Sequence, residues 1–320
     1  MQNKYYNMKL GKISLLFLTL SILVFSCKKD DNIDDPIVVE ARDRGEQQLA
    51  DNDSLVKYLE THYYNSDAFI GNSDPSISDI IITDLEEDGY TLLKDAVETI
   101  SIVYKGVDTS YDFYVLRLNQ GGGDSPNFTD NIKVLYEGFL LDGTIFDKND
   151  VVESSFDLLG VVEGWRRVMP LFNTAESFIE VGDGTINYLN SGLGVMFLPS
   201  GLGYFSGTGP TGGLSAYSPL IFKFELLRMS ENDHDADGVP SYLEDLDGDG
   251  EFYVNFDDLT DATDDDTDGN GFANFNDSDD DGDGVLTINE DIDGDGDPTN
   301  DIGANGIPKY LDATETESKP

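Results

Sequence analysis

The stretch that decides the fold reads Val134-Leu135-Tyr136-Glu137-Gly138 and, two residues later, Leu141-Asp142-Gly143-Thr144-Ile145-Phe146-Asp147. Apolar and polar residues alternate on both sides of the Asp142-Gly143 pair, which is a strong signal for a β-hairpin. A later apolar run, Leu220–Leu227, is typical of a further strand, and a short helix is expected after Gly164. These features predict an α+β fold that combines a small antiparallel sheet with one short helix.

Three more motifs follow the hairpin in order. They are a strand start at Phe156, the run Val161-Val162-Glu163-Gly164-Trp165, and the run Leu198-Pro199-Ser200-Gly201-Leu202-Gly203-Tyr204. Together with the hairpin and the last strand, these motifs resemble the FKBP-type peptidyl-prolyl isomerases over residues 123–229. The resemblance implies a sheet wrapped on the short helix, an aromatic-lined pocket between them that takes a proline ring, and isomerase (rotamase) activity without a catalytic cofactor.

The resemblance also implies which residues form the catalytic pocket. Matched motif by motif, these are Tyr136, Phe146, Asp147, Phe156, Val161, Val162, Trp165, Tyr204, Leu214 and Phe222. In the family picture Trp165 is the floor, and the Val162 N–H and the Tyr204 hydroxyl donate to substrate carbonyl oxygens. Asp147 is then a polar rim residue and not a general base.

An apolar pocket of this kind suits the chemistry. Rotation about an X–Pro bond meets a barrier of roughly 20 kcal/mol, because the amide gives up its resonance. An apolar cavity disfavours the charge-separated planar amide relative to the less polar twisted one, so no acid, base or nucleophile is required. The alternative interpretation is that the aromatic residues are the plain core of a β domain.

Two segments depart from the family pattern. The link Phe172–Leu193 is longer than usual, and the loop Phe205–Pro219 is rich in Gly and Ser, with Pro210 where one branch of the family has a histidine. These differences affect the expected substrate preference more than the basic chemistry.

The charge is concentrated at the C-terminal end. The chain carries 64 Asp or Glu against 19 Lys or Arg, a net charge of −45, which excludes a nucleic-acid binder with a general basic face. From Glu231 to Pro320 there are 30 acidic residues and 2 lysines, a net −28. We therefore expect a domain boundary directly after Ser230.

This acidic segment contains three twelve-residue loops with calcium-binding spacing, in which oxygens stand at positions 1, 3, 5 and 12 and glycine at position 6. The predicted ligands are Asp233, Asp235, Asp237 and Glu244; Asp266, Asp268, Asn270 and Asp277; and Asp279, Asp281, Asp283 and Glu290. Weaker copies start at Asp245 and Asp291, and a degenerate one at Asp301. The gaps are too short for helix–loop–helix hands, and the array resembles thrombospondin type 3 repeats, with Ca²⁺ as a structural cofactor and little regular secondary structure. A solvated acidic tail is the alternative.

The N-terminus has the layout of an export signal. Lysines precede the apolar run Ile13–Phe25, and Leu23-Val24-Phe25-Ser26-Cys27 resembles a bacterial lipobox, so Cys27 is the predicted lipidation site. It is the single cysteine in the chain, which excludes an intramolecular disulfide. Lys29-Asp30-Asp31 resembles the export signal of Bacteroidetes lipoproteins. We expect an outer-membrane lipoprotein, facing either the periplasm or the cell surface.

Between the tether and the pocket motifs lies a region without evident chemistry. Asp53 is the expected cap of a helix over residues 54–64, and strands are expected at 80–82, 100–104 and 111–118. His62 is interpreted as a structural residue. The predicted domains are 1–26 signal peptide, 27–48 flexible tether, 49–122 accessory region, 123–229 isomerase domain, 230–314 calcium repeats and 315–320 tail.

Two functions remain open from the sequence. The first is a lipid-anchored prolyl isomerase that acts on proline-containing clients during the folding of exported proteins. The second is a calcium-dependent surface binding or adhesion protein with a non-catalytic FKBP-like domain.

Overall fold

The computed structural model describes residues 41–182, 184–210, 212–261 and 264–319. The predicted signal peptide, Cys27 and the tether up to residue 40 lie outside the described residues. Within the described ranges, no helix combines the length and the apolar character that crossing a bilayer requires.

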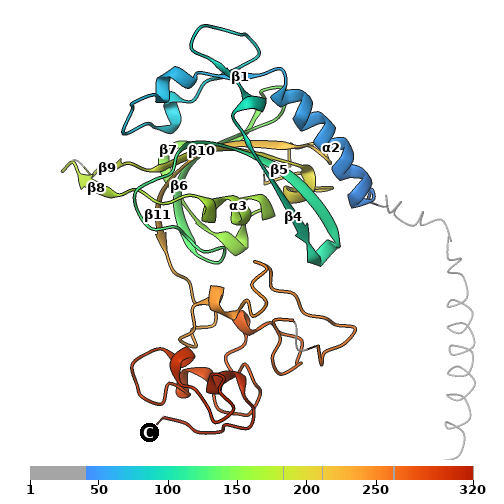
Figure 1. Ribbon diagram of the computed structural model, residues 1–320, viewed down its shortest axis with the longest axis vertical. Helices are drawn as coiled ribbons and strands as arrows, with labels where there is room; N and C mark the ends of the chain where they lie inside the picture. The colour runs from blue at the N-terminus through green and yellow to red at the C-terminus, as the bar shows by residue number, and fades with distance from the viewer. Residues whose placement is uncertain (1–40, 183, 211, 262–263, 320) are drawn as a thin grey trace, which may run out of the picture. The chain divides into compact units, whose positions relative to one another are not determined.

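A six-stranded antiparallel sheet is the centre of the fold, in the order β4-β5-β10-β11-β6-β7 (Figure 1). Its strands are β4 (Glu98–Tyr104), β5 (Thr109–Asn119), β6 (Asn131–Phe139), β7 (Ile145–Asp157), β10 (Gly192–Leu198) and β11 (Leu220–Ser230). The predicted hairpin is confirmed as β6–β7, and Gly143 in its turn has a φ of 81°, a conformation that favours glycine. The predicted α+β class is confirmed as well.

Each face of the sheet has its own apolar core. On one face, side chains such as Phe113, Met196 and Phe224 pack with the short helix α3 (Glu163–Val168). On the other, Val195 and Ile221 pack with the longer helix α2 (Arg44–Leu59), and Figure 1 shows the two helices on opposite sides of the sheet. Since both faces are covered, all residues of β10 are buried, and the strand reads as an unbroken apolar run.

Two strands of this sheet come from the region that the sequence analysis treated as accessory. β5 pairs with β10, for example Leu116 with Val195, and β4 pairs with β5. The expected division at residue 122 therefore runs through a single sheet. Pairing between strands so distant in sequence carries no local signal, because it depends on which edges meet in the folded chain.

The predicted helix boundaries were wrong. Helix α2 starts ten residues earlier than expected, with Asp43 as its N-cap: the carboxylate accepts from the Glu46 N–H at 2.8 Å. Asp53 lies inside the helix, and the last residues of the predicted tether, Arg44–Gln48, already belong to it. The helix ends at Leu59, because Tyr63–Tyr64 form a short strand instead of a last turn.

Smaller elements complete the fold. A three-stranded sheet joins β1 (Tyr63–Tyr64) to β2 (Ile82–Thr83) and β3 (Thr91–Leu92). The lengthened link after Phe172 contains a hairpin, β8 (Ser177–Glu180) with β9 (Ile186–Leu189). From Glu231 onward the described residues form loops and short 3₁₀ turns, as predicted.

A buried carboxylate fastens α2 to the loop that follows β10. Asp51 is 2 % exposed and accepts hydrogen bonds from the Ser200 N–H at 2.8 Å and from its hydroxyl at 2.6 Å. The Gln47 amide also donates to Asp51, at 2.6 Å. Ser200 begins the long loop that carries Tyr204, so α2 holds that loop in place.

Replacing this carboxylate should be costly. We expect Asp51→Ala to lower the free energy of unfolding by about 2–3 kcal/mol, because it leaves the buried Ser200 donors without an acceptor. Urea unfolding of the full chain measures the effect. The matched control is Asp53→Ala on the exposed side of the same helix, and equal losses in both variants would contradict the role of Asp51.

A second buried carboxylate joins the sheet to the turn at Ile77. Glu225 of β11 is 8 % exposed and accepts from the Ile77 N–H at 2.9 Å. Burial raises the pKa of Glu225 above its ordinary value. The folded protein therefore holds this proton more tightly than the unfolded chain, so the contribution of Glu225 to stability is fully present at acidic pH and is lost as the pH rises through the folded-state pKa.

Glu225→Gln should reveal this dependence. The neutral amide keeps an acceptor for Ile77 and removes the buried charge, so the stability of the variant relative to wild type should increase from pH 4.5 to pH 8. Denaturant unfolding at the two pH values measures the difference, with the exposed Glu180→Gln as control. A difference that does not change with pH would refute the argument.

Candidate functional site

The face of the sheet that carries α3 holds a cavity of about 470 Å³, here called the aromatic cup. Its lining residues are Tyr136, Asp147, Phe156, Gly160, Val161, Val162, Trp165, Tyr204, Pro210 and Phe222. Eight of the ten residues predicted for the pocket are among them. Residues from β6, β7, α3, β11 and the loop after β10 thus converge on one cavity.

Trp165 is the structural centre of the cup. It is 3 % exposed and is surrounded edge to face by Tyr136 at 5.7 Å, Phe156 at 5.7 Å and Phe222 at 5.3 Å between ring centroids. Such pairs contribute about 0.5–1.5 kcal/mol each beyond the area they bury. The rings that line the cup therefore also hold one another in position.

Two glycines permit this packing. A Cβ on Gly164 would lie 2.3 Å from a Leu198 methyl carbon, so glycine lets α3 approach β10 and bring Trp165 to the sheet. A Cβ on Gly138 would lie 2.7 Å from the Phe222 ring and 2.8 Å from the Phe146 ring. Glycine in β6 thus leaves space for the wall of the cup.

Two predicted pocket residues do not line the cavity. Phe146 packs edge to face against Phe222, with ring centroids 5.4 Å apart. Leu214 is 5 % exposed within the core on the same face. Phe146 thus supports the wall residue Phe222, and Leu214 belongs to the surrounding core. Conversely, Gly160 and Pro210 line the cup although neither is among the predicted pocket residues; Pro210 is one of the departures from the family pattern.

The rim of the cup carries polar groups. Burial and the neighbouring Asp147 carboxylate, to which the Tyr136 hydroxyl donates, raise the pKa of Tyr136 to about 12. Burial, then Asp147, also raises the pKa of Tyr204. Both tyrosines are therefore neutral hydroxyls at physiological pH. Among the described residues, no acceptor is found for the Val162 N–H.

The helix below the cup also contacts the acidic segment. Arg167 of α3 donates to the Glu251 carboxylate at 2.7 Å and to the Asp249 carbonyl at 2.8 Å. It is also paired with Glu163, at 2.6 Å. A basic residue two positions after Trp165 thus binds the backbone and a side chain of the loop that starts at Asp245.

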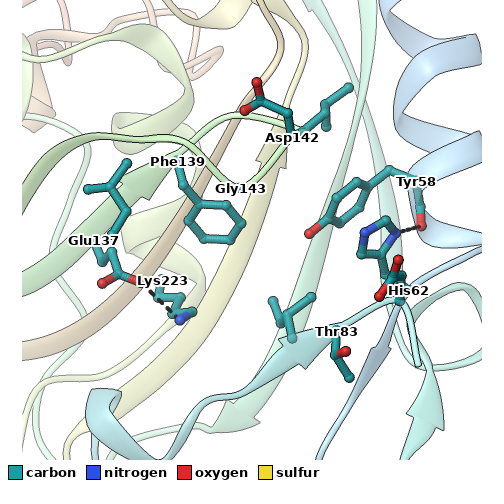
Figure 2. Close-up of a pocket in the computed structure, with 12 residues that line it drawn as sticks. Tyr58, His62, Thr83, Glu137, Phe139, Asp142, Gly143 and Lys223 are labelled. Carbon is teal, nitrogen blue, oxygen red and sulfur yellow. Dashed lines mark hydrogen bonds and ion pairs between the residues drawn. The ribbon is translucent and has the colours of Figure 1, made fainter. Parts of the chain in front are cut away.

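A second cavity, of about 540 Å³, lies on the opposite face of the sheet (Figure 2). Tyr58 and His62 face Phe139 of β6 across it, and Glu137 of the same strand is paired with Lys223 at 2.9 Å. The His62 ring stacks on Tyr58 at 3.7 Å, in line with the structural role expected for it. This cavity is larger than the aromatic cup, but its lining contains none of the residues predicted for the pocket.

The acidic segment gathers its carboxylates in clusters. Among the described residues, five groups have ligand atoms within 4.8 Å of one another: Asp233, Asp235 and Asp237; Asp237, Glu244 and Asp280; Asp245, Asp247 and Asp265; Asp279, Asp281 and Asp283; and Asp291, Asp293 and Asp295. The two weaker copies, at Asp245 and Asp291, thus also form clusters. The twelve-residue spacing does not assign Asp265 or Asp280 as ligands. Each stands in a run of adjacent aspartates, and that run is the sequence signal that could have identified it.

The three main loops share the same internal geometry. The glycines at position 6 have positive φ angles of 100° at Gly238, 94° at Gly271 and 93° at Gly284. The side chain at position 9 accepts from the N–H of position 2, as when Ser241 accepts from His234 at 3.0 Å and Asn274 from Thr267 at 2.9 Å. His234, at position 2 of the first loop, also contacts the sheet: its Nε2 lies 3.3 Å from a carboxylate oxygen of Asp157 in β7.

The buried carboxylates fit a bound cation. Glu244 is fully buried and Glu290 is 1 % exposed, yet within the described part of the chain neither carboxylate oxygen of either residue has a hydrogen-bond partner. Buried charges in proteins are paired or coordinate metals. Several of these acidic groups are thus suited to hold a metal ion.

The loop at Asp266 differs from the other two. No group of three carboxylates converges there in the described ranges. Instead, the Asn270 amide donates to Asp268 at 3.0 Å and to Asp277 at 2.5 Å. The ligand set predicted for this loop is therefore joined by hydrogen bonds among its own members.

Comparison with known proteins gives separate results for the two parts. The chain is 31% identical over 137 residues to the FKBP-type peptidyl-prolyl cis-trans isomerase FkpA of Aeromonas hydrophila, covering 42% of this chain and 44% of that protein. It is 28% identical over 114 residues to the FKBP-type 22 kDa peptidyl-prolyl cis-trans isomerase of Escherichia coli K12, covering 35% and 47%. The chain thus spans less than half the length of these relatives. Residues 234–294 match the family described as BamM C-terminal.

Two solved structures are also similar in part. A peptidyl-prolyl cis-trans isomerase from Pseudomonas syringae has a TM-score of 0.35 at 18% identity, over 58% of this chain and 95% of that one. FkpA from Escherichia coli has a TM-score of 0.32 at 16% identity, over 72% and 74%.

Proposed function

We propose that the protein is an FKBP-type peptidyl-prolyl cis-trans isomerase that acts on proline-containing polypeptides. The observation that carries the proposal is the aromatic cup: eight residues assigned from motifs spread along the chain line one cavity around Trp165. Partial similarity to two FKBP-type isomerases supports it.

In this proposal the cup binds the proline ring and disfavours the planar amide. The aromatic walls exclude water, so the charge-separated resonance form of the X–Pro amide loses solvation, while the twisted form, which is less polar, loses little. Catalysis then consists of binding the twisted amide more tightly than the planar one. The uncatalysed exchange takes on the order of tens to hundreds of seconds.

The polar rim orients the substrate. The Tyr204 hydroxyl and the Val162 N–H are donors for carbonyl oxygens on either side of the proline. Because the pKa of Tyr204 is raised, its hydroxyl stays protonated at neutral pH and remains a donor. Asp147 accepts from Tyr136 and so fixes the orientation of the rim.

Tyr204→Phe tests the catalytic role without removing a wall of the cup. A lost hydrogen bond of about 1 kcal/mol should lower kcat/KM about fivefold in a protease-coupled proline-peptide assay. The control is Tyr188→Phe, whose hydroxyl donates to Glu153 away from the cup and whose removal should leave the rate unchanged.

The same assay decides between catalysis and binding. Trp165→Ala is a less informative variant than Tyr204→Phe. It removes a ring from the core and should lower the free energy of unfolding by about 3–5 kcal/mol, so a lost rate would not separate catalysis from folding. A wild-type rate no higher than the uncatalysed one would overturn the isomerase proposal and leave a protein that binds proline-containing partners without turnover.

We further propose that the chain is an outer-membrane lipoprotein, anchored through Cys27, whose clients are exported proteins. The apolar run before Cys27 and the adjoining lipobox-like residues support this location. Labelling of cells with a radioactive fatty acid, with Cys27→Ser as control, tests the anchor. Protease treatment of intact cells separates the surface from the periplasmic face.

In the acidic segment, calcium is proposed to take the place of an apolar core. Carboxylate oxygens are the donors that Ca²⁺ prefers, and extracellular modules bind it at roughly 0.1–1 mM. The ion would lower the repulsion among the 30 acidic residues that follow Ser230. At a free calcium concentration of 100 Kd, each occupied site adds about 2.7 kcal/mol to the stability of the folded segment.

Chelation should therefore unfold this segment selectively. In EGTA we expect residues after Ser230 to become sensitive to limited proteolysis, while the sheet and α2 stay resistant. Mass spectrometry of the fragments locates the cuts, and the addition of Ca²⁺, but not of equal Mg²⁺, should restore protection. Cleavage that is the same with and without calcium would refute the structural role of the ion.

A further inference from the structure

One of the acidic clusters joins two loops that lie far apart in the sequence. Asp237 and Glu244 belong to the first loop, whereas Asp280 belongs to the loop that starts at Asp279, and their ligand atoms lie within 4.8 Å of one another. Asp237, Glu244 and Asp280 are 1 %, 0 % and 1 % exposed. Asp280 occupies the second position of its loop, where the twelve-residue spacing places no ligand.

The charges of this cluster are not compensated within the described residues. Both Glu244 oxygens, one Asp237 oxygen and one Asp280 oxygen have no hydrogen-bond partner there. No ion pair of the described residues includes any of the three. The other Asp280 oxygen accepts from the Thr287 hydroxyl at 3.2 Å. Three adjacent buried carboxylates without counter-charge are strongly unfavourable unless a cation or protons neutralise them.

A cation bound by the first loop alone does not account for the cluster. Asp233, Asp235 and Asp237 form a separate group, and it shares only Asp237 with the group that contains Asp280. Together the two groups contain five carboxylates, so one divalent cation would leave a net charge of −3 and a second would leave −1.

We propose that Asp237, Glu244 and Asp280 hold a second divalent cation, of the calcium type, which links the first loop to the Asp279 loop. The donors are all carboxylate oxygens, which suit Ca²⁺ better than the nitrogen- and sulfur-seeking Zn²⁺. This site rests on the proposed calcium binding of the acidic segment and is independent of the isomerase proposal. Its function is to tie these two distant loops of the segment together.

A tyrosine beside the cluster provides a local probe. Tyr310 is 3 % exposed, and its pKa is raised by burial and then by the charges of Asp280, Glu244 and Asp237. Because the charges of all three carboxylates act on its hydroxyl, its ring is the expected donor of excitation energy to a Tb³⁺ ion that replaces Ca²⁺ in this cluster. The share of tyrosine-sensitised terbium emission that is lost when Tyr310 is replaced thus reports on this site.

The first experiment counts the ions. Calcium bound per full-length chain is measured by equilibrium dialysis and metal analysis for wild type, Asp280→Asn and the exposed control Asp257→Asn. We expect the number to fall by one in Asp280→Asn and to stay unchanged in the control. An unchanged number in Asp280→Asn would overturn the proposal, and a wild type that binds no calcium would overturn the calcium role of the whole segment.

The second experiment does not depend on the fold of Asp280→Asn. Tyr310→Phe keeps all the carboxylates, so it should bind the same number of ions as wild type while tyrosine-sensitised terbium emission falls at least twofold. Equal emission from Tyr310→Phe and wild type would place the terbium elsewhere and refute the site. Loss of isomerase activity, or its absence, affects neither readout.

Discussion

The close approach of α3 to the sheet is the constraint on which the rest of the structure depends. Gly164 lets the helix lie directly on Leu198 of β10, and this contact brings the next residue, Trp165, among three aromatic rings. A larger residue at position 164 would push the helix outward and open the ring contacts. The rings that line the cup therefore belong to the same packed core as the helix.

Helix α2 positions part of the cup's rim although it lies on the other face of the sheet. Helix α2 packs on the far face of the sheet, and its buried Asp51 holds Ser200 at the start of the loop that carries Tyr204. Arg44 of the same helix lies over the Phe205 ring at 4.2 Å. The rim donor is thus positioned by residues that never contact the cavity.

Sequence patterns predicted what is local and missed what is not. The β6–β7 hairpin and the loop glycines have strong short-range signals, and the family resemblance implied eight of the residues that line the cup. The start of α2 was missed because Asp43 and Asp53 are equally good caps by residue type, although Glu46, three residues after Asp43, is a capping signal that Asp53 lacks. The pairing of β5 with β10, and the place of Asp280 beside the first loop, depend on contacts between distant segments that no spacing rule encodes.

The double coverage of the sheet has a practical consequence. A recombinant fragment cut at residue 123 would lack two strands and leave Val195, Phe197 and Ile221 bare to solvent, a surface prone to aggregation. One that began at Asp51 would keep the anchoring carboxylate but lose the helical turns and the cap that precede it. The smallest piece worth expressing begins upstream of Asp43, well before the first residue of the cup.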